Sequence, residues 1–575
     1  MTPVRFLLSV PPGRGRGDPD IAWHDRLEAI QGDRLSAWVA DDADRISFVG
    51  GALFGRIFGR DSSRRLTALP GDGPSSRDPA AFAAWLTTQV WGGWFAVLHD
   101  GVTRSVLVAR DPSPLLPVFR VGSGERVMYA TDPGTLARAG ARLQVSWPDL
   151  AAQLVRPELR AGRTCLEGMD EVVPGRLVGV EPSAKVPVKL WTPWEFATRP
   201  WRADRQEAAA RLRAIAVQCM SAWTRDAGHV AVAASGGVDS SFICAALAVS
   251  GARFDCATVA TSDPSGDESR YVRQLADALG VRVVKRTFDP ADVDLTRPAS
   301  AGLVRPVRKA FLTPFRRALA NACAELGADT VFDGNGGDNL FAYLHSSTPA
   351  LDRLWQHGPG RGFARTVVDL CRLTDMDLPA MIRALVVRAV RGPGQSFKPD
   401  ATLLACGIAD RPGPAPLLDW LADAPARRPG KRAHVAMLLR TWSFVDDLAG
   451  VDTPHAFSPL LSQPLVEFCL SVPTWAWCRD GINRSLARDA FAADLPASIV
   501  ARVSKSGPDS FIRRTVARDR ALLRELLLDG LLHSHGLLDA RAVEAALRAD
   551  ALGDDPRLYR LLDFAEAETW ARSWR

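Results

Sequence analysis

The chain has 575 residues, of which 47% are hydrophobic and 24% charged. This length predicts two or three domains with large cores, and the composition is typical of a folded globular protein and excludes a disordered one. The net charge of +6 is mild for this size, and no Lys/Arg run is interleaved with aromatic residues, so nothing favours a nucleic-acid partner.

The nine cysteines are dispersed, with no CxxC pair and no Cys/His cluster at zinc-ligand spacing. Such a set predicts reduced, mostly buried thiols. The N-terminus carries no signal-peptide pattern, and no run of about 18 apolar residues occurs. We therefore expect a cytoplasmic protein without a membrane span.

The first 200 residues favour β structure. Residues 94–98 and 105–109 flank a His99-Asp100-Gly101 turn signal, which predicts a hairpin. Residues 126–130 predict another short strand, and residues 172–180 predict a turn followed by a strand.

Proline- and tryptophan-rich sequence at residues 187–201 predicts a linker. We therefore place one domain at residues 1–200 and a second at residues 205–575.

From residue 205 onward, helices and short apolar strands alternate. Helices are predicted at 205–224, 241–249 and 268–279, and strands at 229–234, 254–261, 282–287 and 330–332. Short apolar runs fit buried parallel strands, and their alternation with helices predicts a doubly wound α/β sheet. Beyond about residue 350 the pattern is helical and arginine-rich.

A strand, a glycine pair and a helix follow one another at Ser235-Gly236-Gly237-Val238-Asp239-Ser240. Two glycines permit a tight turn that exposes successive N–H groups, and these groups with the helix N-terminus form an anion site. The two serines add hydroxyl donors, and Asp239 is suited to hold Mg²⁺ that bridges phosphate oxygens. The alternative is a plain strand-to-helix turn with an Asp/Ser cap; a Walker A loop is excluded, because no Gly-Lys-[Ser/Thr] follows.

Residues 331–341 repeat this arrangement: an apolar strand enters a loop that contains Asp333, Gly334, Asn335 and Asp338. Ligands of a doubly wound sheet bind beyond the carboxyl ends of its strands, so both loops are expected to face one site. Asp338 is then a second Mg²⁺ ligand, whereas Asp333 fits either the site or a cap of the turn. The alternative for the whole segment is an Asx-rich surface turn.

A late lysine, Lys505, lies in a Ser-Lys-Ser-Gly loop after a predicted helix. Only seven lysines occur in this arginine-rich chain. Lys505 could reach a phosphate or a developing oxyanion, and the alternative is a solvated loop lysine.

The three motifs occur in the order found in the asparagine synthetase superfamily, and the resemblance covers nearly the whole chain. Residues 94–97, 109–112 and 127–132 resemble the glutaminase-type domain of those enzymes. The resemblance implies an α+β, degenerate Ntn-type β-sandwich at residues 1–200. It also implies an ATP-pyrophosphatase (adenine nucleotide α-hydrolase-like) domain with a helical C-terminal part at residues 205–575, which uses ATP and Mg²⁺ to adenylate a carboxylate.

One departure concerns the source of the amine. Glutamine-using members carry a nucleophilic cysteine after Met1, whereas this sequence has Thr2 there, and its first cysteine is Cys165. Without that nucleophile we expect no glutamine hydrolysis, so the amine must belong to the substrate. Superfamily members that resemble this logic are β-lactam synthetases and lasso peptide cyclases.

Later segments resemble the lasso peptide cyclases: residues 336–341, 458–467, 472–475 and 487–496. This resemblance implies adenylation of an Asp or Glu side chain of a linear core peptide. The peptide's own N-terminal amine then closes a macrolactam, with release of AMP and pyrophosphate. It also implies a role in lasso peptide (RiPP, antibiotic) biosynthesis beside a leader-peptide protease as partner.

The resemblance also assigns site residues. Residues 235–240 would hold pyrophosphate, and Ala233, Val259 and Gly334 would lie near the adenosine, with Lys505 stabilising charge. Asn335 departs from the glutamate of asparagine synthetases and the tyrosine of β-lactam synthetases, and an amide cannot serve as a general base. His434 is a candidate base, with a buried structural histidine as the alternative.

Three other functions remain open at this stage. One is a β-lactam synthetase-like ring closure on a small amino acid, and another is an ammonia-dependent asparagine synthetase. The third is a non-catalytic binding protein that retains the fold.

Overall fold

The structure is a computed structural model of the chain. It describes residues 3–10, 25–27, 36–71, 73–74, 77–103, 105–123, 126–180, 187–225, 227–262, 267–308, 311–392, 394, 396–446, 455–503, 508–548 and 555–575. None of the helices within these ranges is long and apolar enough to cross a membrane.

The N-terminal part is built from two six-stranded antiparallel sheets. The first has the order β10-β8-β9-β1-β3-β2, with β1 (Phe6–Val10), β2 (Asp25–Leu27), β3 (Ser36–Val39), β8 (Phe119–Ser123), β9 (Arg126–Ala130) and β10 (Met169–Glu171). The second has the order β12-β11-β7-β6-β5-β4, with β4 (Arg45–Phe48), β5 (Gly51–Gly59), β6 (Val90–His99), β7 (Val106–Arg110), β11 (Arg176–Gly179) and β12 (Val188–Lys189).

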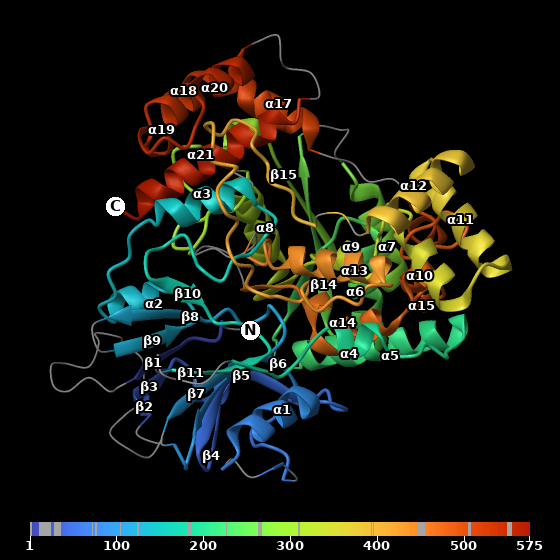
Figure 1. Cartoon of the computed structure of the whole chain (residues 1–575), viewed down its shortest axis with the longest axis horizontal. Helices are drawn as coiled ribbons and strands as arrows, with labels where there is room; N and C mark the ends of the chain where they lie inside the picture. Colours follow the sequence, from blue (N-terminus) through green and yellow to red (C-terminus); the bar gives the residue numbers. More distant parts are fainter. Residues whose placement is uncertain are drawn as a thin grey trace.

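The two sheets face each other across an aromatic core. The ring of Phe6 stacks on those of Phe54 and Phe95, with centroids 5.1 and 5.2 Å apart. Strands β6 and β7 pair with Val97 opposite Val108, which confirms the expected hairpin. Helix α1 (Pro79–Gln89) covers the outer face of the second sheet, where Asp78 caps its first turn (Figure 1).

Residues 187–201, which we expected to form a linker, instead pack against the helices of the second half. Trp191 and Trp194 are buried; their indole N–H groups donate to Glu467 at 2.9 Å and to the carbonyl of Trp420 at 2.7 Å. Burying these large aromatic rings against the helices of the second half is more favourable than leaving them in water. Residues 194–197 form the short helix α4 (Trp194–Ala197).

The second half is centred on a five-stranded, all-parallel sheet with the order β15-β14-β13-β16-β17. Its strands are β13 (Val230–Ala233), β14 (Phe254–Thr261), β15 (Val283–Phe288), β16 (Thr330–Phe332) and β17 (His455–Phe457). The structure thus has an N-terminal sheet domain followed by a parallel sheet, as expected. Strand β17 was not predicted, because the sequence beyond residue 350 indicated helices only.

Helices cover both faces of the parallel sheet. On one face α5 (Arg205–Thr224), α6 (Val238–Ser250) and α7 (Ser269–Leu279) pack against Val230 and Phe332. On the other, α8 (Leu312–Leu326) packs against Ala231 and Val331. Adjacent strand residues point to opposite faces, which is why these strands are apolar throughout.

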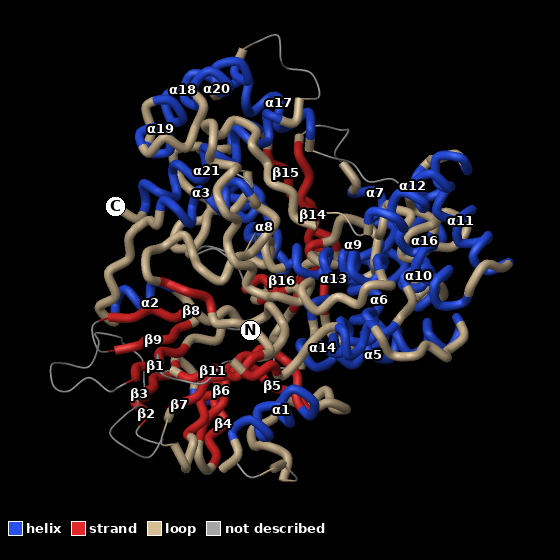
Figure 2. Tube along the Cα trace, viewed as in Figure 1, coloured by secondary structure: helices blue, strands red, loops and turns tan. Residues whose placement is uncertain are grey.

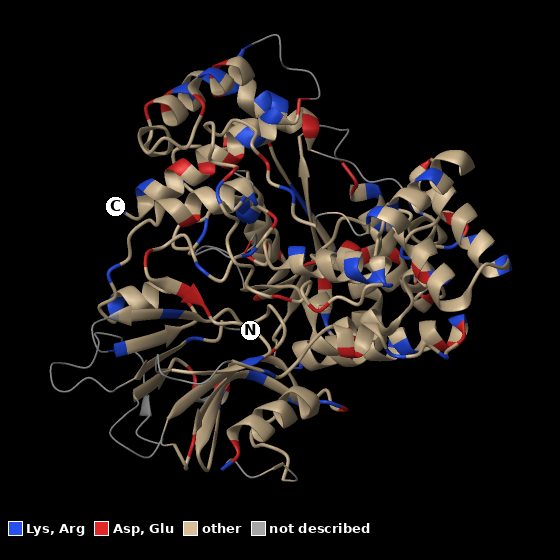
Figure 3. Cartoon of the chain, in the orientation of Figure 1, with Lys and Arg blue, Asp and Glu red and all other residues tan. Residues whose placement is uncertain are grey.

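The remaining helices lie around this sheet and over the N-terminal part (Figures 1 and 2). They are α2 (Pro133–Arg138), α3 (Trp147–Val155), α9 (Gly337–Leu340), α10 (Thr348–His357), α11 (Arg361–Thr374), α12 (Leu378–Arg391), α13 (Pro429–Thr441), α14 (Gln463–Ser471), α15 (Ser485–Ala490), α16 (Ala497–Val500), α17 (Asp509–Arg518), α18 (Arg520–Leu528), α19 (Leu531–Ser534), α20 (Ala540–Leu547) and α21 (Arg557–Ser573). Buried residues of α17, α18 and α21 share one core with α3 and the first sheet. Basic and acidic residues are interspersed along the ribbon of both halves (Figure 3).

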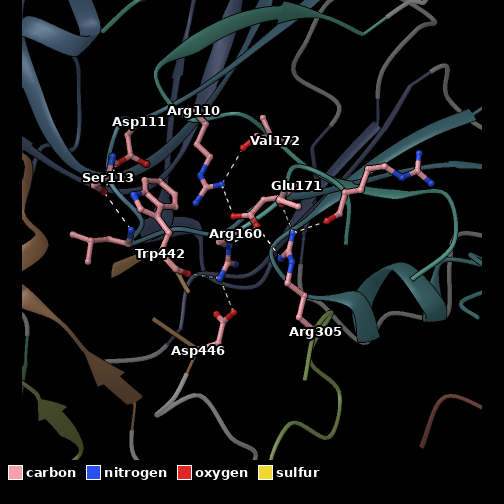
Figure 4. Close-up of polar contacts among 12 residues, drawn as sticks. Arg110, Asp111, Ser113, Arg160, Glu171, Val172, Arg305, Trp442 and Asp446 are labelled. Carbon is pink, nitrogen blue, oxygen red and sulfur yellow. Dashed lines mark hydrogen bonds and ion pairs between the residues drawn. The ribbon is translucent and has the colours of Figure 1, made fainter. Parts of the chain in front are cut away.

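A buried ion network joins the two halves (Figure 4). The Glu171 carboxylate is fully buried and binds three guanidinium groups: Arg110 at 3.0 Å, Arg160 at 2.7 Å and Arg305 at 3.0 Å. Arg160 also donates to Asp446 at 2.8 Å. Burial alone would raise the pKa of Glu171, yet the three arginines lower it to about 2.

Candidate active site

The two glycine-rich loops lie next to each other at the centre of the parallel sheet. Strands β13 and β16 are hydrogen-bonded neighbours, and the strand order reverses between them. This reversal is the position where doubly wound sheets bind ligands. A Cβ on Gly334 would lie 3.1 Å from the backbone N of Ser240, and one on Gly337 would collide with Asp239. Glycine at both positions therefore lets the second loop approach the first.

The first loop is shaped by one left-handed glycine. Gly236 has φ +64, and a Cβ there would lie 2.5 Å from the Cβ of Tyr271 on α7. The Ser235 N–H donates to the Ser240 hydroxyl, and the Gly237 N–H donates to the Ser235 hydroxyl, each at 3.3 Å. Helix α6 then begins at Val238, with a glycine as its N-cap. Its first turn therefore points N–H groups toward the loop, as an anion site requires.

In the second loop, Asp333 holds the turn. Its buried carboxylate accepts the Asn335 backbone N–H at 3.0 Å and the Ser458 hydroxyl at 2.8 Å. The side-chain amide of Asn335 also donates to Asp333, at 3.2 Å. Of the two roles expected for Asp333, this geometry supports the cap, and it directs the Asn335 amide toward the turn.

Asp239 and Asp338, the two expected Mg²⁺ ligands, meet at one arginine. Nη1 of Arg484 lies 2.9 Å from Oδ2 of Asp239 and also contacts Oδ1 of Asp338. A single cation can thus bridge both carboxylates. Among the described residues no group of three or more His, Cys, Asp and Glu could form a metal site of protein ligands alone. Two carboxylates nevertheless fit Mg²⁺, which commonly binds through one or two carboxylates together with substrate phosphate oxygens.

Arg488 supports this arrangement from α15. Its guanidinium donates to the backbone carbonyls of Asn483 at 2.9 Å and Arg502 at 2.7 Å. Burial and, to a smaller extent, the neighbouring charge of Arg484 together lower the pKa of Arg488 to about 10. Arg488 thereby connects the segment before α15 with the chain that follows α16.

Arg502 brings that following chain to the first loop. Its Nη1 donates to the Ser235 carbonyl at 3.1 Å, its guanidinium pairs with Glu268, and it lies 4.1 Å above the Tyr271 ring. Lys505 comes three residues later in the sequence, but it lies outside the described residues.

The three residues expected near the adenosine lie on adjacent elements of the sheet. Ala233 ends β13 and pairs with Ala257 on β14, so Val259 lies two residues nearer the carboxyl end of that strand. Gly334 lies in the neighbouring loop. Their contact with a nucleotide stays a prediction.

His434 is enclosed in the core. It lies on α13, is fully buried, and its Nε2 is 2.9 Å from the Leu340 carbonyl. Burial and, to a smaller extent, the charge of Lys431 together lower the pKa of His434 to about 3. A histidine that stays neutral and inaccessible at pH 7 is poorly suited to accept a proton from a substrate amine, so this geometry supports the structural alternative.

Residues 211–572 match the family model described as asparagine synthase. The chain belongs to the asparagine synthase family. It is accordingly an ATP-dependent enzyme that forms amide bonds.

No curated protein matches this member of the asparagine synthase family. Two of the solved structures that match show only a weak likeness. One is the allosteric regulatory enzyme of purine biosynthesis, at 12% identity and TM-score 0.21, over 58% of this chain and 83% of that one. The other is the glutamine phosphoribosylpyrophosphate amidotransferase from B. subtilis complexed with ADP and GMP, at 10% identity and TM-score 0.18, over 53% of this chain and 77% of that one. Likeness at this level carries no inference about function.

Sequence reasoning missed the residues that connect the loops of this family member. Arg484, Arg502 and Tyr271 belong to no motif, and Arg488 lies in the segment 487–496 without an assigned role; a single arginine is not distinctive among the many arginines of the chain. Their roles are visible only where distant segments meet.

Proposed function

We propose that the protein is an ATP-dependent lasso peptide cyclase. The observation that carries the proposal is a two-loop acidic site in an amide-forming family member whose N-terminal part offers no reactive thiol. Cys165 is the first cysteine of the sequence and is buried, and burial raises its pKa to about 12. A thiol of that pKa is not a nucleophile at pH 7 and would not release ammonia from glutamine, so in this proposal the amine belongs to the substrate.

The first step is adenylation. An Asp or Glu carboxylate oxygen of the linear peptide attacks the α-phosphorus of ATP, and the bond to the β-phosphate oxygen breaks to release pyrophosphate. The N–H groups of residues 235–240 would hold that pyrophosphate. Asp239 and Asp338 would hold Mg²⁺, which neutralises phosphate charge when bound.

The second step closes the ring. The N-terminal amine of the same peptide attacks the activated carbonyl carbon, loses a proton, and expels AMP to leave an isopeptide bond. Lys505 would stabilise the charge that develops in both steps. Holding both ends of one peptide together supplies effective molarity, which can lower the barrier by roughly 7–11 kcal/mol.

The reaction requires a free N-terminal amine. If the core peptide is made as part of a longer precursor, that amine appears only after proteolysis. We therefore propose a leader-peptide protease as the protein partner. Cyclisation of a precut core peptide but not of the intact precursor would support this order of events.

Product analysis tests the proposal. The purified protein is incubated with ATP, Mg²⁺ and a linear core peptide, and mass spectrometry and nucleotide chromatography follow the products. We expect AMP and a peptide lighter by one water. AMP without that mass loss would refute ring closure, and ADP would refute adenylation. AMP release that depends on aspartate and ammonium, or on a small amino acid alone, would instead indicate an asparagine synthetase or a β-lactam synthetase-like enzyme.

A further inference from the structure

One guanidinium nitrogen serves two carboxylates from different loops. Asp239 belongs to the loop after β13, Asp338 to the loop after β16, and both contact Nη1 of Arg484. The side chains of Arg484 and Asp239 are only 12% and 14% exposed, whereas that of Asp338 is 38% exposed. Two carboxylates so close together repel each other unless a cation lies between them, and here the cation is part of the chain.

The position of Arg484 is determined by its surroundings. Its backbone has φ +51, in the left-handed region that non-glycine residues rarely adopt. Its Nε donates to the Asn483 side chain at 2.8 Å, and its guanidinium lies 5.1 Å from the Tyr343 ring centroid. Backbone strain of this kind persists where neighbouring contacts over-determine it, and it is concentrated at functional sites.

The guanidinium and a bound Mg²⁺ would compete for the same oxygens. Asp239 and Asp338 would hold Mg²⁺ through the same carboxylates that Nη1 of Arg484 contacts, so the ion and the guanidinium could not both keep these contacts. Two cations there would also repel each other. A released guanidinium stays tethered next to the first loop, and its forked donors match phosphate oxygens.

We propose that Arg484 is an internal counter-ion that exchanges with Mg²⁺. It holds the two acidic loops together before the nucleotide binds, and it turns from Asp239 and Asp338 to the phosphates when the metal arrives. This inference rests on the Mg²⁺–ATP site of the proposed function, but not on the identity of the peptide substrate.

Direct binding measurements test the exchange without any turnover. Isothermal titration calorimetry would measure Mg²⁺ binding to the nucleotide-free protein, and then pyrophosphate binding at saturating Mg²⁺. Because binding couplings are reciprocal and typically amount to about 5–150-fold, Arg484→Gln should bind Mg²⁺ at least about fivefold more tightly than wild type. The same variant should bind pyrophosphate more weakly, by about tenfold.

The direction of the Mg²⁺ effect separates exchange from a merely structural role. If Arg484 only positioned the loops, its loss would leave Mg²⁺ binding unchanged or weaken it, and either result in folded Arg484→Gln overturns the proposal. Arg213→Gln is the matched control, because Arg213 also pairs with a carboxylate, that of Asp494, while its other partners, the Ala490 carbonyl and the Phe491 ring, belong to neither acidic loop. Both affinities should equal those of wild type in this control.

A second variant covers the case in which Arg484→Gln does not fold. Arg484→Lys retains a cation but not the forked donors, so its pyrophosphate affinity should fall while its Mg²⁺ affinity stays near that of wild type. Unchanged pyrophosphate affinity in Arg484→Lys would overturn the phosphate contact. Failure of peptide cyclisation would leave these readouts intact, whereas wild-type protein that binds neither Mg²⁺ nor pyrophosphate would refute the nucleotide site itself.

Discussion

Replacing Glu171 by Gln should be among the most destabilising single changes in the chain. The Glu171 carboxylate is fully buried and offsets the guanidinium charges of Arg110, Arg160 and Arg305. Glutamine keeps the shape but removes the charge, and its NH₂ group would face donors. Removal of one partner from a buried ion network typically costs about 3–5 kcal/mol, because the remaining charges stay buried.

The pKa of Glu171 gives a second way to gauge how much its charge contributes to the stability of the fold. The three arginines overcome burial and lower the pKa from 4.5 to about 2. A depressed carboxylate pKa stabilises the folded state above the unfolded pKa, and this contribution is lost as the pH falls from 4.5 toward 2. The shift corresponds to about 3 kcal/mol at neutral pH, which is of the same order as the typical cost of breaking a buried ion network.

Urea denaturation followed by tryptophan fluorescence would measure both effects. We expect Glu171→Gln to lose about 3–5 kcal/mol of unfolding free energy at pH 7, and to lose the acid dependence between pH 4.5 and 2 that Glu171 gives the wild type. Glu325→Gln is the control, because Glu325 pairs with Arg286 at the surface, where the two side chains are 53% and 36% exposed. The unfolding free energy that Glu325→Gln loses should stay below about 1 kcal/mol. A loss of less than about 1 kcal/mol in Glu171→Gln would refute the reasoning.

Three further predictions concern the site. Gly236→Ala should raise the apparent KM for ATP in pyrophosphate exchange, because a methyl group there collides with α7. Gly251→Ala is the control, because Gly251 has a similar left-handed backbone but lies in open space. The control should lower only the melting temperature. Asp239→Asn should lower ATP–pyrophosphate exchange by roughly 100-fold or more with an unchanged circular dichroism spectrum, and full activity would contradict a metal role. His434→Leu should cost about 1–3 kcal/mol in denaturation. Because its pKa is about 3, the pH–rate profile between about pH 5 and 8 should not change, and a lost limb there would restore His434 as a base.

Local patterns predicted several elements to the residue. The expected boundaries of α5 (Arg205–Thr224), β14 (Phe254–Thr261), β16 (Thr330–Phe332) and β9 (Arg126–Ala130) agree with the structure. Each has a periodicity or an apolar run bounded by clear breaks, so its type depends little on distant contacts.

Elements that depend on distant partners were not found in this way. Strand β17 has only three residues, His455–Phe457, and it is a strand because it pairs with β16 more than a hundred positions earlier. The stretch at residues 187–201 has the composition of a linker, yet Trp191 and Trp194 are buried and donate to Glu467 of α14 and to the Trp420 carbonyl. The composition of a segment indicates only its local conformational preference. Whether its side chains are buried depends on which distant segments pack against it in the fold.

The sequence by itself determined the two acidic loops and their order, since a tight glycine turn between a strand and a helix is a local requirement. Only the tertiary structure showed that Asp239 and Asp338 share one cation, because Arg484 lies 245 positions from the first and 146 from the second. An arginine has no distinguishing pattern in a chain rich in arginine. Arg484 acquires its role only because the fold places it between two negative charges in a largely buried site.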